Sequence, residues 1–137
     1  MEAYNQAIEQ ISDKIDIGCS DKNIEQSMRY AYSVCPHKRI RVIRNWQWWD
    51  IDFNDEYLAA VHQDGLLPSL VYCEDLIYDS RLLLTTSGGR VRTSLLKKFH
   101  TKHSLFETHR THYILNGLGE RKAVKAELVF NINLTST

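Results

Sequence analysis

The sequence carries no net charge, because 17 lysines and arginines balance 17 aspartates and glutamates. Overall charge therefore gives no reason to expect attraction to nucleic acid or to an anionic membrane. Proline and glycine are scarce, at two and six residues, and no Pro-rich or Gly/Ser-rich tract divides the chain. These absences exclude fibrous and disordered classes of protein. We therefore expect residues 1–137 to form a single domain.

Long hydrophobic runs and cysteine pairs are also missing. The longest apolar stretches, such as Leu82–Leu84, are far shorter than the roughly 20 residues that cross a bilayer. The first fifteen residues mix acidic and apolar side chains, unlike an export signal. The three cysteines are widely spaced and form no C-x-x-C motif, which favours free thiols in a reducing compartment. We therefore expect a cytoplasmic protein with no membrane contact.

Apolar periodicity predicts three helices and a strand in the first half of the chain. Spacings of three and four residues predict one helix over residues 4–15 and a second over residues 24–35. Alternation of charged and apolar residues over positions 39–46 predicts a half-buried strand. A third, short helix is expected over residues 55–64, where an Asp-Gly pair ends it.

The second half of the chain is rich in β-branched, aromatic and leucine residues, which predicts strands. Turn signals separate these runs at Ser87–Gly89, His100–His103 and Asn116–Gly117. The expected fold is α+β, with N-terminal helices packed on a strongly bent antiparallel sheet or small β-barrel, whose central hairpin spans Arg90–Leu115. The expected strands cover residues 70–77, 82–85, 90–99, 105–115 and 126–134.

Charge is neutral only in sum. Residues 45–87 carry a net charge of −7, whereas residues 88–125 carry a net charge of +7 and four of the six histidines. A face of one sign steers a charged partner even when the net charge is zero. Unless the two segments neutralise each other in the fold, the basic strands offer a binding surface. Within an extended strand, Lys97 and Lys98 are expected to point to opposite faces. The candidate residues are Arg90, Arg92, Lys97, Lys98, Lys102 and Arg110.

The densest aromatic cluster is formed by Trp46, Trp48 and Trp49. Strand alternation places Trp46 and Trp48 on one face and Trp49 on the other, so at least one indole is expected near the surface or under the following helix. Core packing is the first explanation for such residues. If exposed, Trp48 or Trp49 would be an anchor for a protein partner.

Motifs that carry catalysis are absent, since the chain has no nucleophile elbow, zinc-protease helix, phosphate-binding loop or dinucleotide fingerprint. We therefore expect no catalytic residue and no cofactor. His100 and His103 could converge in a turn, but no further ligand with zinc spacing completes a set, so no metal is predicted. Glu107 and His109 lie two apart in an expected strand, and we interpret them as a solvated surface pair.

A local signature runs from Val91–Ser94 (V-R-T-S) through Phe106–Thr108 (F-E-T) to Thr111–Leu115 (T-x-Y-x-L). It resembles a β-hairpin signature of small uncharacterised proteins of bacteria and their prophages, in which the second strand reads F-E-T-x-N-T-x-Y-x-L. The resemblance covers residues 40–122, and Arg110 stands where those proteins usually have asparagine. It implies a small cytoplasmic protein from a mobile element and no particular activity.

By analogy, small proteins in that setting commonly work by binding and blocking. We therefore expect a non-enzymatic binding protein that contacts a protein partner through complementary charge. Its specific role is expected to be that of a phage or prophage inhibitor, with an anti-defence or antidote-like action. The alternatives are a nucleic-acid-binding protein that uses the basic strands of residues 88–125, and a small hydrolase-type enzyme with a histidine-containing site.

Overall fold

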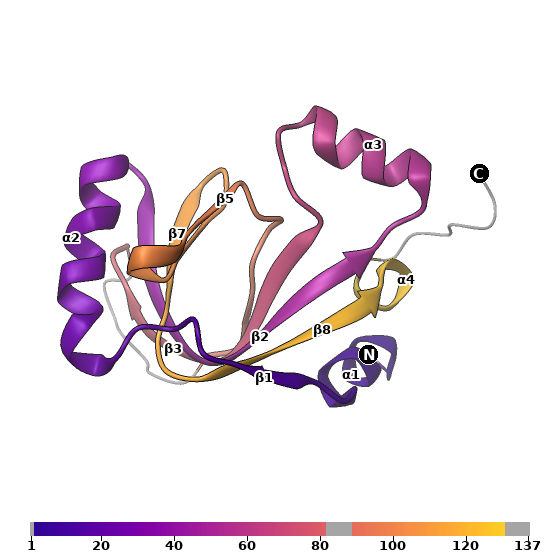
Figure 1. Ribbon diagram of the computed structural model, residues 1–137, viewed down its shortest axis with the longest axis horizontal. Helices are drawn as coiled ribbons and strands as arrows, with labels where there is room; N and C mark the ends of the chain where they lie inside the picture. Colours follow the sequence, from indigo (N-terminus) through magenta and orange to yellow (C-terminus); the bar gives the residue numbers. More distant parts are fainter. Residues whose placement is uncertain (1, 82–88, 131–137) are drawn as a thin grey trace.

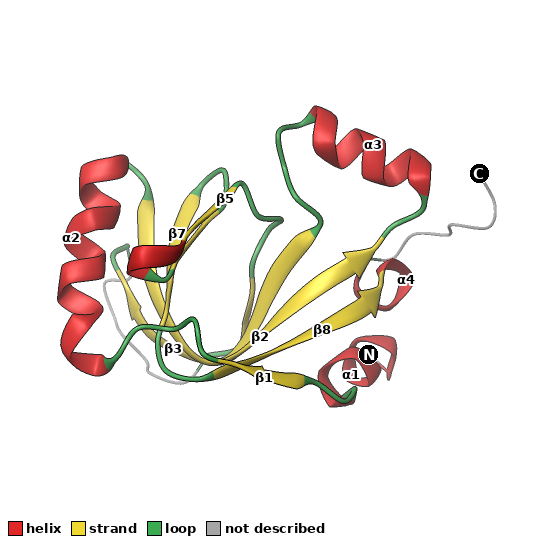
Figure 2. Cartoon of the chain, in the orientation of Figure 1, coloured by secondary structure: helices red, strands yellow, loops and turns green. Residues whose placement is uncertain are grey.

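The computed structural model describes residues 2–81 and 89–130, and it contains four α-helices, two 3-10 turns and eight strands within them (Figure 2). The helices are α1 (Glu2–Glu9), α2 (Ile24–Val34), α3 (Asp55–Gln63) and α4 (Ala126–Val129), and the 3-10 turns are η1 (Asp21–Asn23) and η2 (Thr101–His103). The strands are β1 (Asp13–Ile15), β2 (Arg39–Asp52), β3 (Ser69–Asp79), β4 (Val91–Arg92), β5 (Lys98–His100), β6 (Leu105–Glu107), β7 (Thr111–Leu115) and β8 (Gly119–Lys125).

The α+β class is confirmed, and helices α2 and α3 lie where periodicity predicts them. The predicted helix over residues 4–15 is too long, because α1 ends at Glu9 and residues 13–15 form a strand that pairs with β8. Residues 126–129 are helical rather than extended, which corrects the expected last strand. The expected strand over residues 82–85 lies outside the described residues. Within the part of the chain that is described, no helix is both long and apolar enough to cross a membrane.

The sheet is mixed rather than antiparallel, which corrects the expected topology. The long strand β2 pairs antiparallel with β3 on one side, and on the other side it pairs parallel with β7 and then with β8. A parallel neighbour requires a crossover connection. The chain between β2 and β7 contains α3 and strands β3 to β6, so it is long enough to bring β7 alongside β2 in the same direction.

Strands β7 and β8 continue each other along β2, with an irregularity between them. Arg39 pairs with Thr111, whereas Asp52 pairs with Lys125, so one extra residue enters the second strand between these points. The Asn116 side chain holds this interruption in place, because its amide donates to the Cys19 carbonyl oxygen at 3.0 Å. The predicted turn at residues 116–117 is therefore a bulge, and bulges increase the local twist of a sheet.

Residues 91–100 link the two margins of the curled sheet. At their start, β4 pairs with β3, and the Leu96 amide donates to the Ser69 carbonyl oxygen at 2.8 Å. At their end, β5 pairs antiparallel with β6. The expected single strand over residues 90–99 is therefore split in two, and the sheet curls into an incomplete barrel.

Three apolar clusters hold the layers together. The concave side of the sheet encloses the largest cluster, which includes Trp46, Trp48 and Phe106. On the convex side, α1 and α4 cover a second cluster around Trp49, and α2 covers a third around Ile114. Figure 1 shows α2 at one end of the sheet, α1 and α4 together at the other, and α3 standing out from the sheet.

Candidate functional site

A buried carboxylate, Glu107 at the end of β6, is the centre of a polar cluster. Its side chain is 7% exposed. Lys38, between α2 and β2, donates from Nζ to Glu107 Oε2 at 2.5 Å and also to the Thr108 carbonyl oxygen at 2.7 Å. Burial raises the pKa of Glu107, but the hydrogen bonds from Lys38 and His100 outweigh this effect and hold the pKa at about 2. Glu107 is therefore ionised at neutral pH.

Histidine 100 connects this carboxylate to helix α2. Its Nε2 lies 2.9 Å from Glu107 Oε1, and its Nδ1 lies 2.9 Å from the Tyr30 hydroxyl. Because an ionised carboxylate only accepts hydrogen bonds, Nε2 donates to Glu107, and Nδ1 shares its hydrogen bond with the Tyr30 hydroxyl. The Tyr30 ring also stacks on His103, with 4.0 Å between ring centroids. Both histidines of the 100–103 turn thus contact Tyr30 in α2.

A β-bulge directs two consecutive lysines to the same side of β5. Lys98 is the register partner of Glu107, and the Lys97 amide also donates to the Glu107 carbonyl oxygen, at 2.8 Å. Two residues therefore lie opposite one, which is the arrangement that defines a bulge and that redirects a side chain. The expectation that Lys97 and Lys98 point to opposite faces is wrong, because both line one groove with Glu107.

We call this cavity the lysine groove. It has a volume of about 540 Å³ and lies between the end of α2, the connection after α3, and β5. Three lysines against one carboxylate leave it with net positive charge. Its lining residues are Val34, Cys35, Lys38, Gly65, Lys97, Lys98, His100 and Glu107.

Beneath the groove, His112 on β7 is fully buried. Its Nε2 lies 3.6 Å from Glu107 Oε2, beyond hydrogen-bond distance, and neither ring nitrogen has a hydrogen-bond partner among the described residues. Burial is the main cause that lowers its pKa, against the opposing effect of Glu107. His112 is therefore neutral near pH 7, and the positive charge of the groove comes from its lysines.

The other basic residues singled out from the sequence lie elsewhere. Arg90 is paired with Glu74, with 3.0 Å between Nε and Oε2, and the Arg92 guanidinium lies 5.2 Å from the centroid of the Phe130 ring. Lys102 is exposed in η2, at the opposite end of the β5–β6 hairpin from the groove.

Arg110 is exposed in the turn between β6 and β7 and follows Thr108 and His109. This turn is at the same end of the hairpin as Lys98, because Lys98 pairs with Glu107. The groove and Arg110 therefore form one basic end of the hairpin, separate from Arg90 and Arg92.

All three tryptophans are buried, which confirms core packing as their explanation, and none of the three indoles lies near the surface. Trp48 and Trp49 are 5% and 0% exposed, and the alternation of faces is as expected. Their indole nitrogens donate within β2, from Trp48 to Asp50 at 3.1 Å and from Trp49 to Gln47 at 2.9 Å. Neither ring is available as an exposed anchor.

The acidic and basic segments neutralise each other in part. Arg121 on β8 lies beside Asp50 on β2, with 2.7 Å between Nε and Oδ2, and Arg90 pairs with Glu74. Buried Asp79 on β3 accepts from both Arg39 and Arg41. Burial raises the pKa of Asp79, but the hydrogen bonds from these arginines and from a backbone amide outweigh this effect and lower the pKa to about 2.

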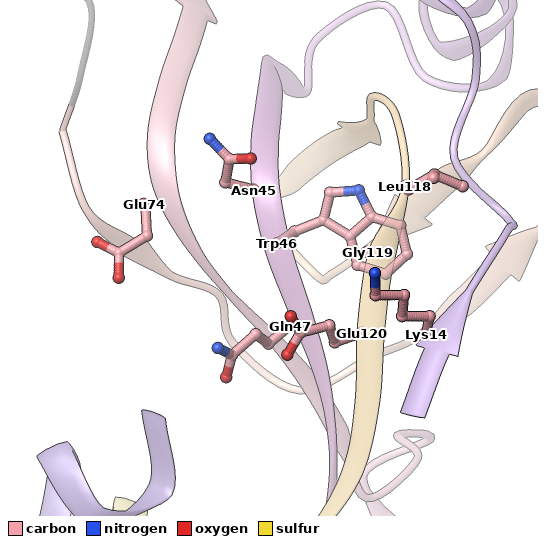
Figure 3. Close-up of a pocket in the computed structure, with 8 residues that line it drawn as sticks. All are labelled: Lys14, Asn45, Trp46, Gln47, Glu74, Leu118, Gly119 and Glu120. Carbon is pink, nitrogen blue, oxygen red and sulfur yellow. The ribbon is translucent and has the colours of Figure 1, made fainter. Parts of the chain in front are cut away.

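A second cavity, of about 260 Å³, lies where β2 changes partners from β7 to β8 (Figure 3). Asn45 in its wall has a positive φ of 54°. Gly119 lies against the Trp46 ring so closely that a Cβ at this position would be 2.4 Å from it. The lining combines one lysine with two glutamates, and it belongs to the bend of the sheet rather than to a charged site.

Chemically, the lysine groove can bind an anionic group. Both ring nitrogens of His100 are engaged, by Glu107 and Tyr30, so neither is free to abstract a proton. Within residues 2–81 and 89–130, no group of three or more histidines, cysteines and acidic residues has the geometry to hold a metal ion. The interpretation of Glu107 and His109 as a solvated surface pair in a strand is wrong, because Glu107 is buried and His109 is exposed in the turn after β6.

The fold and the groove define a small α+β protein with a curled mixed sheet and a basic end. Residues 16–131 match the model of a family described as a domain of unknown function (DUF6957). The chain belongs to this family, which agrees with the expectation of an uncharacterised family. The comparisons with curated proteins and with solved structures gave no match.

Proposed function

We propose that this protein is a binding protein that holds an acidic region of a partner protein in the lysine groove. The observation that carries the proposal is the bulge at Lys97 and Lys98. It brings the side chains of these two consecutive lysines to one cavity, which Lys38 also lines. The side chain of Lys97 is 48% exposed and 3.9 Å from Glu107, so it can reach a ligand. Glu107 holds Lys38 in place, and the side chain of Lys38 is only 12% exposed.

A protein partner is favoured over nucleic acid because the surroundings of the groove are mixed in character. Apolar Val34 lines the groove and is 40% exposed, and Leu67, at 45% exposure, is bridged to the residue before Lys97. Asp64 is exposed at the end of α3 beside Gly65. A polyanion would be repelled by such an acid, whereas protein interfaces combine apolar and charged groups of both signs.

The finer form of the proposal is a mobile-element inhibitor that acts in the cytoplasm by blocking a host protein. The free thiols of Cys19, Cys35 and Cys73 support a reducing compartment. The alternative is a nucleic-acid-binding protein, in which the exposed bases Lys97, Lys98 and Arg110 would contact phosphates. The hydrolase alternative is less favoured, because both nitrogens of His100 are engaged.

The experiment is affinity capture with tagged protein from bacterial lysate, with and without nuclease, followed by mass spectrometry. The test variant is K97E/K98E and the matched control is K22E/K125E, which changes the charge equally at two exposed lysines away from the groove. We expect a protein that survives nuclease and binds the wild type and the control at least about tenfold better than the test variant. Each captured protein is then purified and its affinity for all three chains is measured.

Two results would overturn the proposal. Equal binding to K97E/K98E and to the wild type would remove the groove from the interface. Loss of all captured material on nuclease treatment would favour the nucleic-acid alternative, which predicts that affinity falls steeply with salt.

A further inference from the structure

Helix α3 is amphipathic but covers no part of the core. Its apolar residues Tyr57, Leu58 and Val61 lie on one face, because Tyr57 and Leu58 stand four and three residues before Val61, and all three are half-buried. None of the nine residues of α3 is buried, and among the described residues none of these three belongs to an apolar cluster. Figures 1 and 2 show α3 standing out from the sheet between the ends of β2 and β3.

Local interactions stabilise the first turn of α3. The Asn54 side chain accepts a hydrogen bond from the Tyr57 amide at 2.9 Å, which caps the helix. Asp55 and Glu56 in the first turn complement the helix dipole. The cap and these charges stabilise the first turn, and the half-buried apolar face keeps part of its surface open to a partner.

The C-terminal end of α3 borders the lysine groove. The Leu66 amide donates to the Val61 carbonyl oxygen at 3.1 Å, so the chain turns back directly after the helix. Gly65, in this turn, lines the groove. Leu67 then bridges to Leu96, the residue before the two lysines of the bulge. The end of α3, exposed Leu67 and Lys97 are therefore linked by backbone contacts at the border of the groove.

We propose that α3 and the lysine groove form one docking surface for a segment of another protein in which aspartate or glutamate stands next to aliphatic or aromatic residues. This inference rests on the proposed function and adds to it the chemistry of the partner. The apolar residues of the segment cover Leu58 and Val61, and its carboxylates lie between Lys97 and Lys98. Groove recognition of this kind reads apolar anchors together with flanking charge.

The test uses a displayed library of random 16-residue peptides, selected against the full-length wild-type protein and sequenced. Selected peptides are synthesised, and their affinities are measured for the wild type and three variants. L58S/V61S removes the apolar face, and A59S/A60S is its control on the opposite side of the same helix, where both alanines are exposed. K97E/K98E removes the bulge lysines. Circular dichroism verifies that the variants keep their helix content.

We expect the selected peptides to be enriched in acidic residues adjacent to apolar ones. Their affinity should fall about tenfold or more for L58S/V61S, since two apolar side chains no longer bury their surface. Their affinity should also fall for K97E/K98E, and it should stay within about twofold for A59S/A60S.

The outcomes separate this inference from the proposed function. Peptides that lose affinity for K97E/K98E but bind L58S/V61S normally would overturn the role of α3 and leave the groove as a binding site. Peptides that bind both variants like the wild type, or a selection without enrichment, would overturn both. A dimer by light scattering that L58S/V61S converts to a monomer would show that a second copy covers α3, and would overturn the choice of partner.

Discussion

The ion pair between Lys38 and Glu107 gives the sharpest test of how the polar cluster is built. Both side chains are nearly buried, with exposed fractions of 12% and 7%. Breaking a buried pair by removing one partner leaves an uncompensated charge and costs about 3–5 kcal/mol. We therefore expect K38M to lower the free energy of unfolding by about that amount at pH 7, and E107Q to lower it by a similar amount.

A double-variant cycle distinguishes this mechanism from a general loss of packing. K38M/E107Q leaves neither charge unpaired, so its cost should be smaller than the sum of the single costs by about 1–3 kcal/mol. The measurement is urea-induced unfolding at pH 7, followed by tryptophan fluorescence, with linear extrapolation to zero denaturant. All three tryptophans are buried, so unfolding changes their surroundings.

The matched control is an exposed pair. Arg29 and Glu25 lie on the outer side of α2 with 4.0 Å between charged atoms and exposed side chains. R29M should therefore change the free energy of unfolding by less than about 1 kcal/mol. Additive costs for K38M and E107Q, or a cost for K38M no larger than that of R29M, would refute the reasoning.

Three further predictions concern the buried groups. The pKa of His112 is lowered from 6.5, chiefly by burial, and that of Glu107 is lowered to about 2, so on acidification the unfolded chain binds protons first. The free energy of unfolding should therefore be level between about pH 7 and pH 8 and fall steadily below about pH 6.5. A flat profile from pH 7 to pH 4 would contradict this. Gly119→Ala, whose Cβ would meet an indole ring, should cost about 1–3 kcal/mol by urea unfolding, whereas Gly89→Ala, with open space around it, should cost little. Half-buried Cys35 should react with iodoacetamide before Cys19 and Cys73, because these two thiols are buried and have raised pKa values. Peptide mass spectrometry measures the labelling, and equal labelling of all three thiols would count against this burial.

Local patterns in the sequence were sufficient to predict individual elements. Periodicity placed helices close to α2 and α3, and alternation placed the start of β2 and the opposite faces of Trp48 and Trp49. These features depend on neighbours within one turn of helix or a few residues of strand. The class of fold and the free state of the cysteines followed from composition in the same way.

Pairing between distant segments could be decided only in three dimensions. No local pattern states that β7 lies parallel to β2, because parallel pairing depends on the path of the chain between them. The bulge that turns Lys97 and Lys98 to one side exists only because β5 meets β6 at Glu107.

The candidate site has the same origin. Glu107 resembles a surface residue in its strand, yet it is buried because Lys38 comes from the end of α2, about seventy residues away, to neutralise it. Composition and periodicity thus determined the elements and the class of fold. The lysine groove was decided by tertiary structure, since its charges come from segments that meet only when the sheet curls.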